Sequence, residues 1–572
     1  MKATINNKVL EANPGETVLT VASRAGISIP TLCHIEGLPP TGTCRMCVVE
    51  DMSTGNLIPS CSQPVFDGIC VQTHSTKALA ARKTIIELLL ANHPDDCLYC
   101  VRNGSCILQN YAEELGVRQR RYSGAKSSYD LDISSPSLVR DPDKCILCGK
   151  CVRICEEVQG VSAIDFIGRG SASHIGCAFE EGLNVSSCVN CGQCIMVCPT
   201  GALAEKDDTA RVMAALRDPA VTVVAQHAPA ISVTIAESFG IKPGTDIVDR
   251  MNGTMRRMGF DYIFPTSFSA DLTVLEEANE LIERITAGGP LPLFTSCSPG
   301  WVKFMEEFYP ELVGNVSTCK SPQQMMGAVI KRIWAQEKGI DPKKVFHVSV
   351  MPCTAKKFEC DRPGMREGSI RDVDAVLTTR EFARMIKMFG IDLASVKGEP
   401  ADSPYGERSS AGKIFGASGG VMEAAVRTAY FVITGKELPN LDLKDLRGFE
   451  GIKEAVVVIG SLELRAAVVS GLGNARKLLD SIKSGEKQYH FVEIMTCPGG
   501  CIAGGGQPFT ADPQAIRARM QGLYSIDSSA TLRTAHANLS LKKLYDDHLG
   551  KPGSHTAHEM LHTSYEKREV SK

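Results

Sequence analysis

The sequence predicts a multidomain α+β protein in which small cysteine-rich domains precede a large α/β domain. The chain has 572 residues, too many for one hydrophobic core, and this length predicts about three to five domains. Most of its 23 cysteines lie before residue 200, chiefly in short C-x-x-C runs. Beyond residue 209, apolar runs such as 221–225 and 345–350 look like buried strands, and they alternate with helical stretches as in α/β domains.

Composition excludes several classes of partner and location. The formal charge of -3 argues against nucleic acid or an anionic membrane surface, so we expect protein or small-molecule partners. Clustered C-x-x-C runs differ from a disulfide framework and indicate thiolates that bind metal in a reducing compartment. Residues 1–5 lack the apolar core of a signal peptide, and no run of about 18 apolar residues occurs. We therefore expect a cytoplasmic protein with no membrane partner.

The N-terminal residues 1–32 predict a strand, a turn at 13–15 and an amphipathic helix over 17–25. A set of four cysteines with one C-x-x-C pair follows. Such a set suits either a 2Fe-2S cluster or a structural zinc ion, and the spacing leaves both open. The set consists of Cys33, Cys44, Cys47 and Cys61.

The second set combines one histidine with three cysteines after a helix-like run over 77–90. Imidazole can replace one thiolate at either zinc or iron, and a neutral ligand tends to raise the potential of a cluster. A lone histidine would be weak evidence. The set consists of His93, Cys97, Cys100 and Cys106.

A polar connector over 118–141 leads to a duplicated C-x-x-C-x-x-C-x-x-x-C pattern. It repeats the bacterial ferredoxin run, in which the fourth cysteine of each set ligates the other of two 4Fe-4S clusters. A zinc ribbon would need only two cysteine pairs and leaves Pro199 unexplained. The two predicted clusters are Cys145, Cys148, Cys151 with Cys198, and Cys188, Cys191, Cys194 with Cys155. A series of clusters is an electron relay, which must end at a reaction centre.

Three motifs in the second half place sulfur beside Pro or Gly, the residues with which a backbone turns tightly around a bulky inorganic group. They lie at 295–301, 351–353 and 497–501, each directly after a strand-like run. Loops after buried strands commonly carry active sites. The three motifs are therefore expected to converge on a buried catalytic iron cluster.

At these motifs, and over essentially its full length, the chain resembles the FeFe-hydrogenases, in particular the monomeric clostridial ferredoxin-dependent type. Its 30–34 segment is also similar to catalytic subunits of NAD(P)-linked bifurcating hydrogenases, and residues 1–71 resemble the 2Fe-2S domain shared with respiratory NADH dehydrogenases. The resemblance implies a β-grasp 2Fe-2S domain at 1–78, a one-His three-Cys 4Fe-4S domain at 79–125, a ferredoxin-like two-4Fe-4S domain at 138–208, and a catalytic H-cluster domain at 209–572 that includes a fused small-subunit-like C-terminus.

In this family four cysteines hold a 4Fe-4S unit, and the last also bridges to a di-iron centre carrying CO, CN and azadithiolate. The resemblance implies that Cys353 and Cys497 are ligands, that Cys501 is the bridge and that Cys297 is the proton-transfer thiol. The remaining ligand position holds Ser298. A hydroxyl is far harder to deprotonate than a thiol. Ser298 then ligates weakly, or Cys297 shifts into the ligand role, or the residue was engineered; we expect an assembled cluster with altered activity.

Proton delivery is predicted on a helix over 271–288, where Glu277, Glu280 and Arg284 share one face. Spacing alone favours a solvated ion-pair face. The resemblance instead implies a proton relay through Glu277, Glu280, Ser317 and Arg284 to Cys297, since acids in series suit proton transfer. It also implies that Lys356 holds a cyanide by a charge-assisted contact. Further expected pocket residues, for which simple core packing is the alternative, are Pro229, Ala230, Gln323, Met351, Phe415 and Met495.

Some residues fall outside every pattern. Four cysteines are interpreted as small buried hydrophobes: Cys70, Cys177, Cys319 and Cys360. Near the end, His548, His558 and His562 invite a metal assignment, but the resemblance implies a structural C-terminal segment.

The expected function is reversible interconversion of protons and electrons with dihydrogen. Electrons would come from ferredoxin or another carrier through one 2Fe-2S and three 4Fe-4S clusters, and maturation proteins would supply the di-iron centre. One alternative is a subunit of a flavin- and NAD(P)-linked complex; no G-x-G-x-x-G loop is evident here, so that chemistry would lie on partner subunits. Another is a weakly active sensor or electron-transfer protein, because of Ser298.

Overall fold

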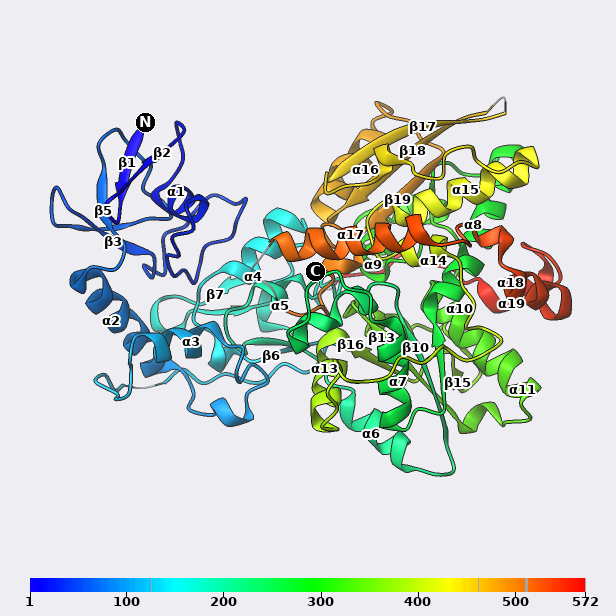
Figure 1. Ribbon diagram of the computed structural model, residues 1–572, viewed down its shortest axis with the longest axis horizontal. Coiled ribbons are helices and arrows are strands. Elements are labelled where there is room, and N and C mark those ends of the chain that lie inside the picture. Colours follow the sequence, from blue (N-terminus) through cyan, green and yellow to red (C-terminus); the bar gives the residue numbers. More distant parts are fainter. Residues whose placement is uncertain (125, 461, 510–512, 571–572) are drawn as a thin grey trace.

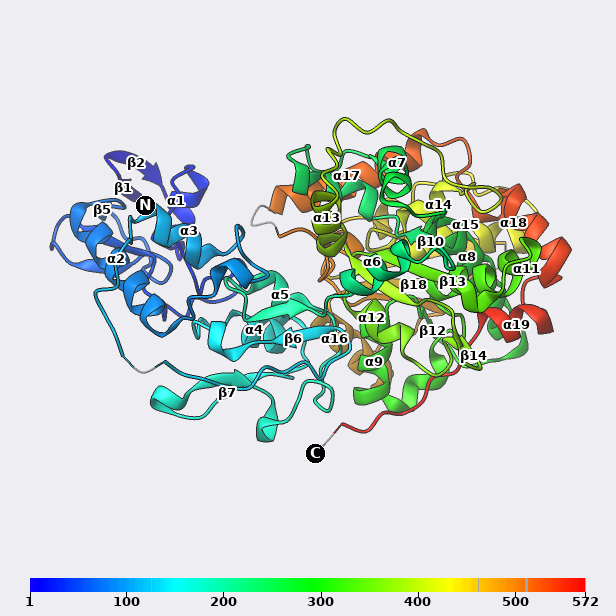
Figure 2. The same ribbon diagram turned by 90° about the horizontal axis from the view of Figure 1, so that it is seen from below.

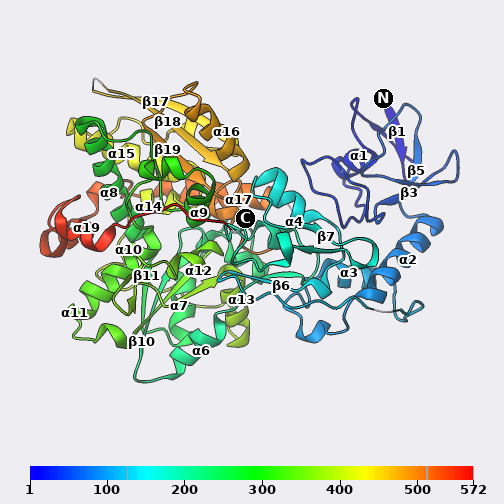
Figure 3. The ribbon, with the colours of Figure 1, turned by 180° about the vertical axis from the view of Figure 1, so that it is seen from behind.

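The computed structural model describes residues 1–124, 126–460, 462–509 and 513–570. The expected domain ends at 125 and 572 lie outside these residues. Figure 1 shows the blue and cyan N-terminal part as an arm beside a larger rounded body, and the views from below and behind agree (Figures 2 and 3). The multidomain architecture predicted from the sequence is confirmed.

The N-terminal domain is a five-stranded mixed sheet covered by one helix, the β-grasp arrangement, with strand order β2-β1-β5-β3-β4. Its elements are β1 (Lys2–Ile5), β2 (Lys8–Glu11), α1 (Val18–Arg24), β3 (Val48–Asp51), β4 (Leu57–Pro59) and β5 (Cys70–Gln72). The expectation of a single strand before residue 13 is wrong. Asn6 and Asn7 both adopt positive φ, which closes a tight hairpin between β1 and β2.

The arm continues with helices that carry the second cysteine set and a compact ferredoxin-like unit. The elements are α2 (Thr76–Asn92), η1 (Cys97–Tyr99), α3 (Ile107–Glu114), β6 (Leu138–Arg140), η2 (Pro142–Lys144), α4 (Lys150–Arg153), η3 (Ile154–Val158), β7 (Asp165–Ile167), η4 (Gly170–Ala172), β8 (His174–Gly176), η5 (Ala178–Glu180), α5 (Gln193–Val197) and β9 (Leu203–Glu205). Strand β6 pairs with β9, so the ends of this unit lie side by side.

The body contains two four-stranded sheets. The first is all parallel, in the order β11-β10-β13-β16, and comprises β10 (Thr222–His227), β11 (Tyr262–Pro265), β13 (Val345–Met351) and β16 (Ala375–Thr378). The second has the order β12-β19-β18-β17 and comprises β12 (Leu293–Phe294), β17 (Ile452–Ile459), β18 (Leu462–Ser470) and β19 (Phe491–Met495). Strands predicted near 221, 293, 345 and 491 are confirmed.

Helices surround and separate the two sheets. In chain order they are α6 (Thr209–Arg217), η6 (Ile231–Val233), η7 (Ile235–Phe239), α7 (Val248–Met258), α8 (Thr266–Ala287), α9 (Pro299–Phe308), η8 (Pro310–Asn315), α10 (Pro322–Val329), η9 (Ile330–Trp334), α11 (Ala335–Glu337), η10 (Pro342–Lys344), α12 (Ala355–Cys360), α13 (Thr379–Met388), α14 (Ser410–Ile414), α15 (Gly420–Thr434), η11 (Lys444–Leu446), α16 (Leu472–Lys483), η12 (Cys501–Ala503), α17 (Pro513–Ser529), η13 (Ala535–Ala537), α18 (Leu539–Leu544), η14 (Tyr545–Leu549) and α19 (His555–Leu561). The hairpin β14 (Arg366–Glu367) and β15 (Ile370–Arg371) lies outside both sheets.

The three cysteine motifs begin at the carboxyl ends of strands in different sheets. Strand β13 belongs to the first sheet, whereas β12 and β19 are neighbours in the second. Helix α8 follows β11 and packs against α10, α14 and α15, which places it beside the space where the motifs meet. The centre therefore lies between two sheets, an arrangement that strand prediction alone does not reveal.

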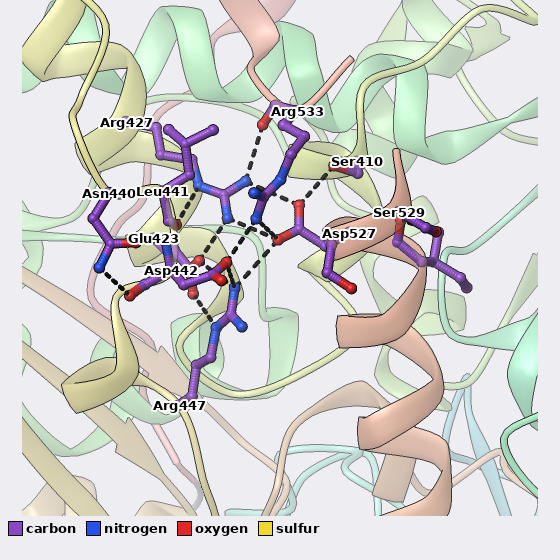
Figure 4. A network of polar contacts seen from close by, with 12 residues as sticks. Ser410, Glu423, Arg427, Asn440, Leu441, Asp442, Arg447, Asp527, Ser529 and Arg533 are labelled. Carbon is purple, nitrogen blue, oxygen red and sulfur yellow. Dashed lines mark hydrogen bonds and ion pairs between the residues drawn. The ribbon is translucent and has the colours of Figure 1, made fainter. Parts of the chain in front are cut away.

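A buried ionic network fastens the helices around this space (Figure 4). Arg427 of α15 contacts Glu423 at 2.6 Å and Asp527 of α17 at 2.9 Å, while Ser410 of α14 donates to Asp527 at 2.6 Å. Burial favours a raised pKa for Asp527, but hydrogen bonds from Arg427 and Arg533 hold this pKa well below its usual range. The carboxylates of Glu423 and Asp527 are thus neutralised by arginines and require no metal ion.

The arm and the body are joined by a second buried pair. Arg380 of α13 contacts Glu205 at 2.8 Å and also donates to the carbonyls of Gly505 and Gln507. Although burial acts to raise it, the charge of Arg380 lowers the pKa of Glu205 to about 2. This pair holds the end of β9 against the loop after η12.

We expect Arg380→Met to destabilise the protein by about 3–5 kcal/mol, because Glu205 stays buried without its partner. The matched control is Arg384→Met on the same helix: Arg384 is more exposed and lies 3.9 Å from Glu205, so its loss should cost less than about 1 kcal/mol. Thermal unfolding and proteolysis near residue 207 measure both effects. Equal melting temperatures for the two variants would contradict the assignment.

Candidate active site

The first cysteine set converges as expected. Cys33 and Cys44 are in thiol contact, as are Cys47 and Cys61. Each pair also acts electrostatically on the other, which places the four sulfur atoms together at one site. The site lies in loops beside the β-grasp sheet, so the fold brings together residues up to 28 positions apart.

In the second set, the hydrogen bonding of His93 leaves one ring nitrogen available for a metal ion. Its Nδ1 lies 3.0 Å from the carbonyl of Pro94, whereas its buried Nε2 has no hydrogen-bond partner among the described residues. A proton on Nδ1 leaves a lone pair on Nε2, the usual state of a ligating histidine. A Cβ on Gly201 would lie 2.5 Å from the sulfur of Cys100, so the ferredoxin-like unit packs directly against this set.

Two cavities occupy the ferredoxin-like unit, and each is lined by four cysteines. One of about 430 Å³ is bounded by Cys145, Cys148, Cys151 and Cys198. The other of about 470 Å³ is bounded by Cys155, Cys188, Cys191 and Cys194. The geometry thus reproduces the crossed grouping predicted from the duplicated motif.

The central cavity of about 820 Å³ lies between the two sheets of the body. It collects the three C-terminal motifs and every expected pocket residue, namely Pro229, Ala230, Cys297, Ser298, Gln323, Met351, Cys353, Lys356, Phe415, Met495, Cys497 and Cys501. Position 504 requires a glycine, because a Cβ there would lie 2.2 Å from the carbonyl oxygen of Pro352. Cys191 lines both this cavity and the neighbouring cavity of the ferredoxin-like unit, so the two share a wall at this residue.

The chemistry of the donors fits an iron-sulfur group. Burial raises the pKa of the Cys353 thiol, and burial followed by the charge of Cys353 raises that of Cys501 to about 12. Without a cation these thiols stay protonated, so thiolate ligands require metal charge in the cavity. Lys356 adds a cationic group at the wall, where its Nζ lies 3.1 Å from the carbonyl of Cys297 and 3.0 Å from Glu359.

Ser298 lines the cavity, but its hydroxyl has other partners. It is the N-cap residue of α9, and its Oγ lies 2.7 Å from Oγ1 of Thr496 and accepts from the backbone nitrogen of Thr496 at 3.3 Å. Thr496 directly precedes Cys497. The serine therefore links the first motif to the third through hydrogen bonds.

The acidic groups of α8 form a series that leads away from Cys297. Glu277 is fully buried and accepts from the backbone nitrogen of Ser296 at 3.4 Å. Ser317 contacts Glu277 and donates to Glu280 at 2.7 Å, and Glu280 pairs with Arg284 at 2.6 Å. Burial, and then the charge of Glu280, raises the pKa of Glu277 to about 8. The interpretation of this face as solvated is wrong for Glu277, because other helices cover it.

Several residues near this series were not recognised as a group in the sequence. Thr318, Cys319 and His562 lie around Glu280, and Glu276 contacts His562. The interpretation of Cys319 as a plain hydrophobe is incomplete, because its thiol lies 3.9 Å from Glu280. Cys360 likewise accepts from Gln323, Cys177 is buried as expected, and Cys70 is only partly buried. The spacing of four residues between Glu276 and Glu280, which puts both on one face of α8, was the one feature of the sequence that indicated this group.

We expect the Glu277 carboxyl to be protonated at pH 7 and to ionise as the pH rises through about 8. Because this pKa exceeds the unfolded value of 4.5, the free energy of unfolding should fall between pH 4.5 and 8, and Glu277→Gln should abolish that fall. Infrared spectroscopy measures the protonated carboxyl band directly. In the control Glu280→Gln the band should disappear at lower pH, since a neighbouring charge is gone. A wild-type spectrum without the Glu277 band at pH 7 would refute this assignment.

None of the helices in the described part of the chain has the length and hydropathy of a membrane-spanning segment.

Five family models match the chain in succession. They are a 2Fe-2S iron-sulfur cluster binding domain (1–76), an NADH-ubiquinone oxidoreductase-G iron-sulfur binding region (82–121), a ferredoxin-like domain of NADH-quinone oxidoreductase subunit 3 (135–204), the C-terminal domain of the iron only hydrogenase large subunit (221–505) and the iron hydrogenase small subunit (513–568).

Relatives match over almost the whole chain. The NADP-reducing hydrogenase subunit HndD of Solidesulfovibrio fructosivorans is 45% identical over 99% of both chains. Iron hydrogenase 1 of Clostridium pasteurianum is 41% identical over 98% of this chain and 99% of its own. The structure of an apo variant of the [FeFe]-hydrogenase HydA1 from Chlamydomonas reinhardtii matches with a TM-score of 0.57 and 42% identity, over 63% of this chain and 99% of the other. With its converging thiols and buried acid series, the chain belongs to the iron-only hydrogenase family.

Proposed function

We propose that this hydrogenase interconverts dihydrogen with protons and electrons at an H-cluster held by Cys353, Cys497, Cys501 and position 298. The observation that supports this best is the meeting of three features at one cavity: buried thiols, an acid series that begins at Cys297, and the shared wall formed by Cys191. The buried thiols suit iron-sulfur ligation, the acid series suits proton movement, and the shared wall suits electron movement. When bound, the cluster supplies the redox-active metal centre at which dihydrogen is formed or split.

The side chains of this chain provide the proton path. Cys297 exchanges a proton with the cavity on one side and with Glu277 on the other. At neutral pH Glu277 is protonated and can donate, because its pKa is about 8. Ser317 links it to Glu280, which Arg284 holds in place. The apolar side chains of Met351, Phe415 and Met495 exclude bulk water from the same space.

The ammonium of Lys356 and the loop at Pro229 and Ala230 suit small anionic ligands. We infer that they hold the two cyanides of a di-iron centre that also carries CO and azadithiolate, supplied by maturation proteins. The charge-assisted contact of Lys356 is stronger than a neutral hydrogen bond and fixes ligand orientation. Its existing partners, the Cys297 carbonyl and Glu359, hold the ammonium in place at the cavity.

Electrons reach the cavity through the arm. We propose one 2Fe-2S cluster on the first cysteine set, a 4Fe-4S cluster on the His93 set and two 4Fe-4S clusters in the ferredoxin-like unit, with ferredoxin or another carrier as donor. Clusters held by thiolates need cysteines that stay reduced, so we propose a reducing, cytoplasmic location.

A second candidate is supported by the relative named as an NADP-reducing hydrogenase subunit, which matches over 99% of both chains. In that case the arm receives electrons from a flavoprotein subunit. Co-purification of a flavoprotein from the native cell, with NADP⁺ reduction by dihydrogen, distinguishes this from dependence on ferredoxin. The retained acid series argues for an active enzyme over a sensor in either case.

The function is tested by infrared spectroscopy and dihydrogen assays after maturation. We expect CO and CN bands and dihydrogen evolution from reduced ferredoxin or a viologen. Cys501→Ala should lose the di-iron bands and reduce the rate to background, while its accessory clusters remain. If matured wild-type protein shows neither bands nor dihydrogen, the proposal is wrong.

Ser298→Cys tests the altered ligand position. We expect CO and CN bands in both wild type and variant, with a shifted cluster potential in the variant, because a thiolate is a softer and more easily formed ligand than an alkoxide. Potentiometric titration measures the shift. Ser298→Ala is the matched control, since it removes the oxygen without adding sulfur. Bands that appear only in the Cys variant would contradict assembly on the serine.

A further inference from the structure

The C-terminal segment lies directly against the loop that carries Ser317. The backbone nitrogen of Lys320 donates to the carbonyl of Leu561, and that of Thr563 donates to the carbonyl of Thr318, both at 2.8 Å. This pairing, together with the contact between His562 and Glu276, fixes His562 beside α8. A histidine that the sequence assigned to structure alone therefore reaches the acid series.

Both ring nitrogens of His562 have partners. Nε2 lies 3.1 Å from Oε2 of Glu276, which also accepts from the backbone nitrogen of Gly553 at 2.9 Å. The hydroxyl of Tyr545 donates to the other oxygen, Oε1, at 2.5 Å. Nδ1 lies 2.7 Å from the hydroxyl of Thr318. With Nε2 donating to Glu276, Nδ1 accepts from Thr318 when the ring is neutral and donates to it when the ring is charged. His562 can therefore gain and lose a proton without losing a hydrogen bond.

His562 is also close to Glu280. The nearest ligand atoms of Glu280, Cys319 and His562 all lie within 4.8 Å of one another. A separation of up to 4.8 Å between His562 and Glu280 suits one bridging water. Glu280 also pairs with Arg284, whose guanidinium donates to the carbonyls of Asn315 and Val316. An arginine does not release its proton in proteins, so Arg284 positions Glu280 but passes no proton itself.

The outer side of His562 faces a broad surface hollow. The hollow has a volume of about 1800 Å³, and besides His562 it is lined by charged residues that include Lys320, Lys331, Arg332, Glu367, Asp372 and Glu559. The exposed ring of His558 stacks on His562 with a centroid separation of 3.9 Å. His562 is thus buried on the side of Glu280 and adjoins solvent on the other.

We propose that His562 is a solvent-side terminus of the acid series, which exchanges protons between the surface hollow and Glu280. The imidazolium gives its Nδ1 proton through one water to the Glu280 carboxylate, while Nε2 keeps its proton hydrogen bonded to Glu276. The neutral ring then takes up a proton at Nδ1 from water that enters from the hollow. The reverse sequence releases a proton. This assignment rests on the proposed hydrogenase function and adds an entry point to its proton path.

The same groups do not form a metal site of comparable quality. Glu280, Cys319 and His562 are donors that zinc accepts. However, both nitrogens of His562 are already hydrogen bonded, and Cys319 has no exposed surface. The titratable and charged groups that face His562 are Glu276 and Glu280 of α8, Cys319, Tyr545 of η14 and His558 of α19, with those of the hollow beyond.

The first experiment measures proton exchange without turnover. After transfer of the matured enzyme from H₂O to D₂O, the infrared band of the protonated Glu277 carboxyl shifts as deuterium enters the series. We expect His562→Gln, whose amide can hydrogen bond but does not titrate, to slow this exchange roughly threefold to tenfold. Since this readout does not require dihydrogen chemistry, failure of the proposed function and failure of this inference are distinguishable. Unchanged exchange in His562→Gln would overturn the proposal.

The second experiment separates proton transfer from positioning. Tyr545→Phe removes another partner of Glu276 but leaves His562, so it should keep the wild-type exchange rate and pH profile. In His562→Ala, added imidazole should restore exchange and dihydrogen evolution. Glu280→Gln should make a further His562→Gln change silent, because the two residues act in series. Additive effects in the double variant, or an effect of Tyr545→Phe equal to that of His562→Gln, would show a structural role instead.

Discussion

The burial of proton-bearing groups between two sheets is the constraint on which the rest of the structure depends. Cys297 and Glu277 are enclosed by protein, and burial raises the pKa values of both groups. A buried thiolate or carboxylate without a partner is costly, so these groups stay protonated until a nearby base or metal accepts the proton. Groups in that condition can carry protons to a centre that bulk water does not reach.

The surrounding fold maintains this enclosure through buried ion pairs. Glu423, Arg427 and Asp527 lock α15 to α17, and Arg380 with Glu205 joins the arm to the body. Each charge is matched, which suits an interior where an unpaired charge would be far more damaging than a missing pair. The consequence for function is geometric: Phe415, Cys501 and Cys191, which come from separate elements, stay in contact with one cavity.

The proposed electron and proton paths approach that cavity from different directions. The cysteine-lined cavities of the arm lead to Cys191, whereas α8 leads from Cys297 toward Glu280 and the C-terminal segment. Separation of this kind allows each path to be tuned without disturbing the other. In our proposal the C-terminal segment does more than cover the body, because its His562 lies beside Glu280 at the outer end of the acid series.

The sequence by itself predicted the ligand chemistry and the domain order. Cysteine spacing is local, so the crossed ferredoxin grouping was predictable, and strands preceding each motif followed from apolar runs. Burial was not predictable from spacing: Glu277 looked like a member of a surface ion-pair face, and only the helices packed on α8 made it a buried acid. His562 and Thr318 are 244 positions apart, and only tertiary structure brought them together. Long-range packing decides which polar groups lose water, and that loss gives an ordinary glutamate or histidine its function.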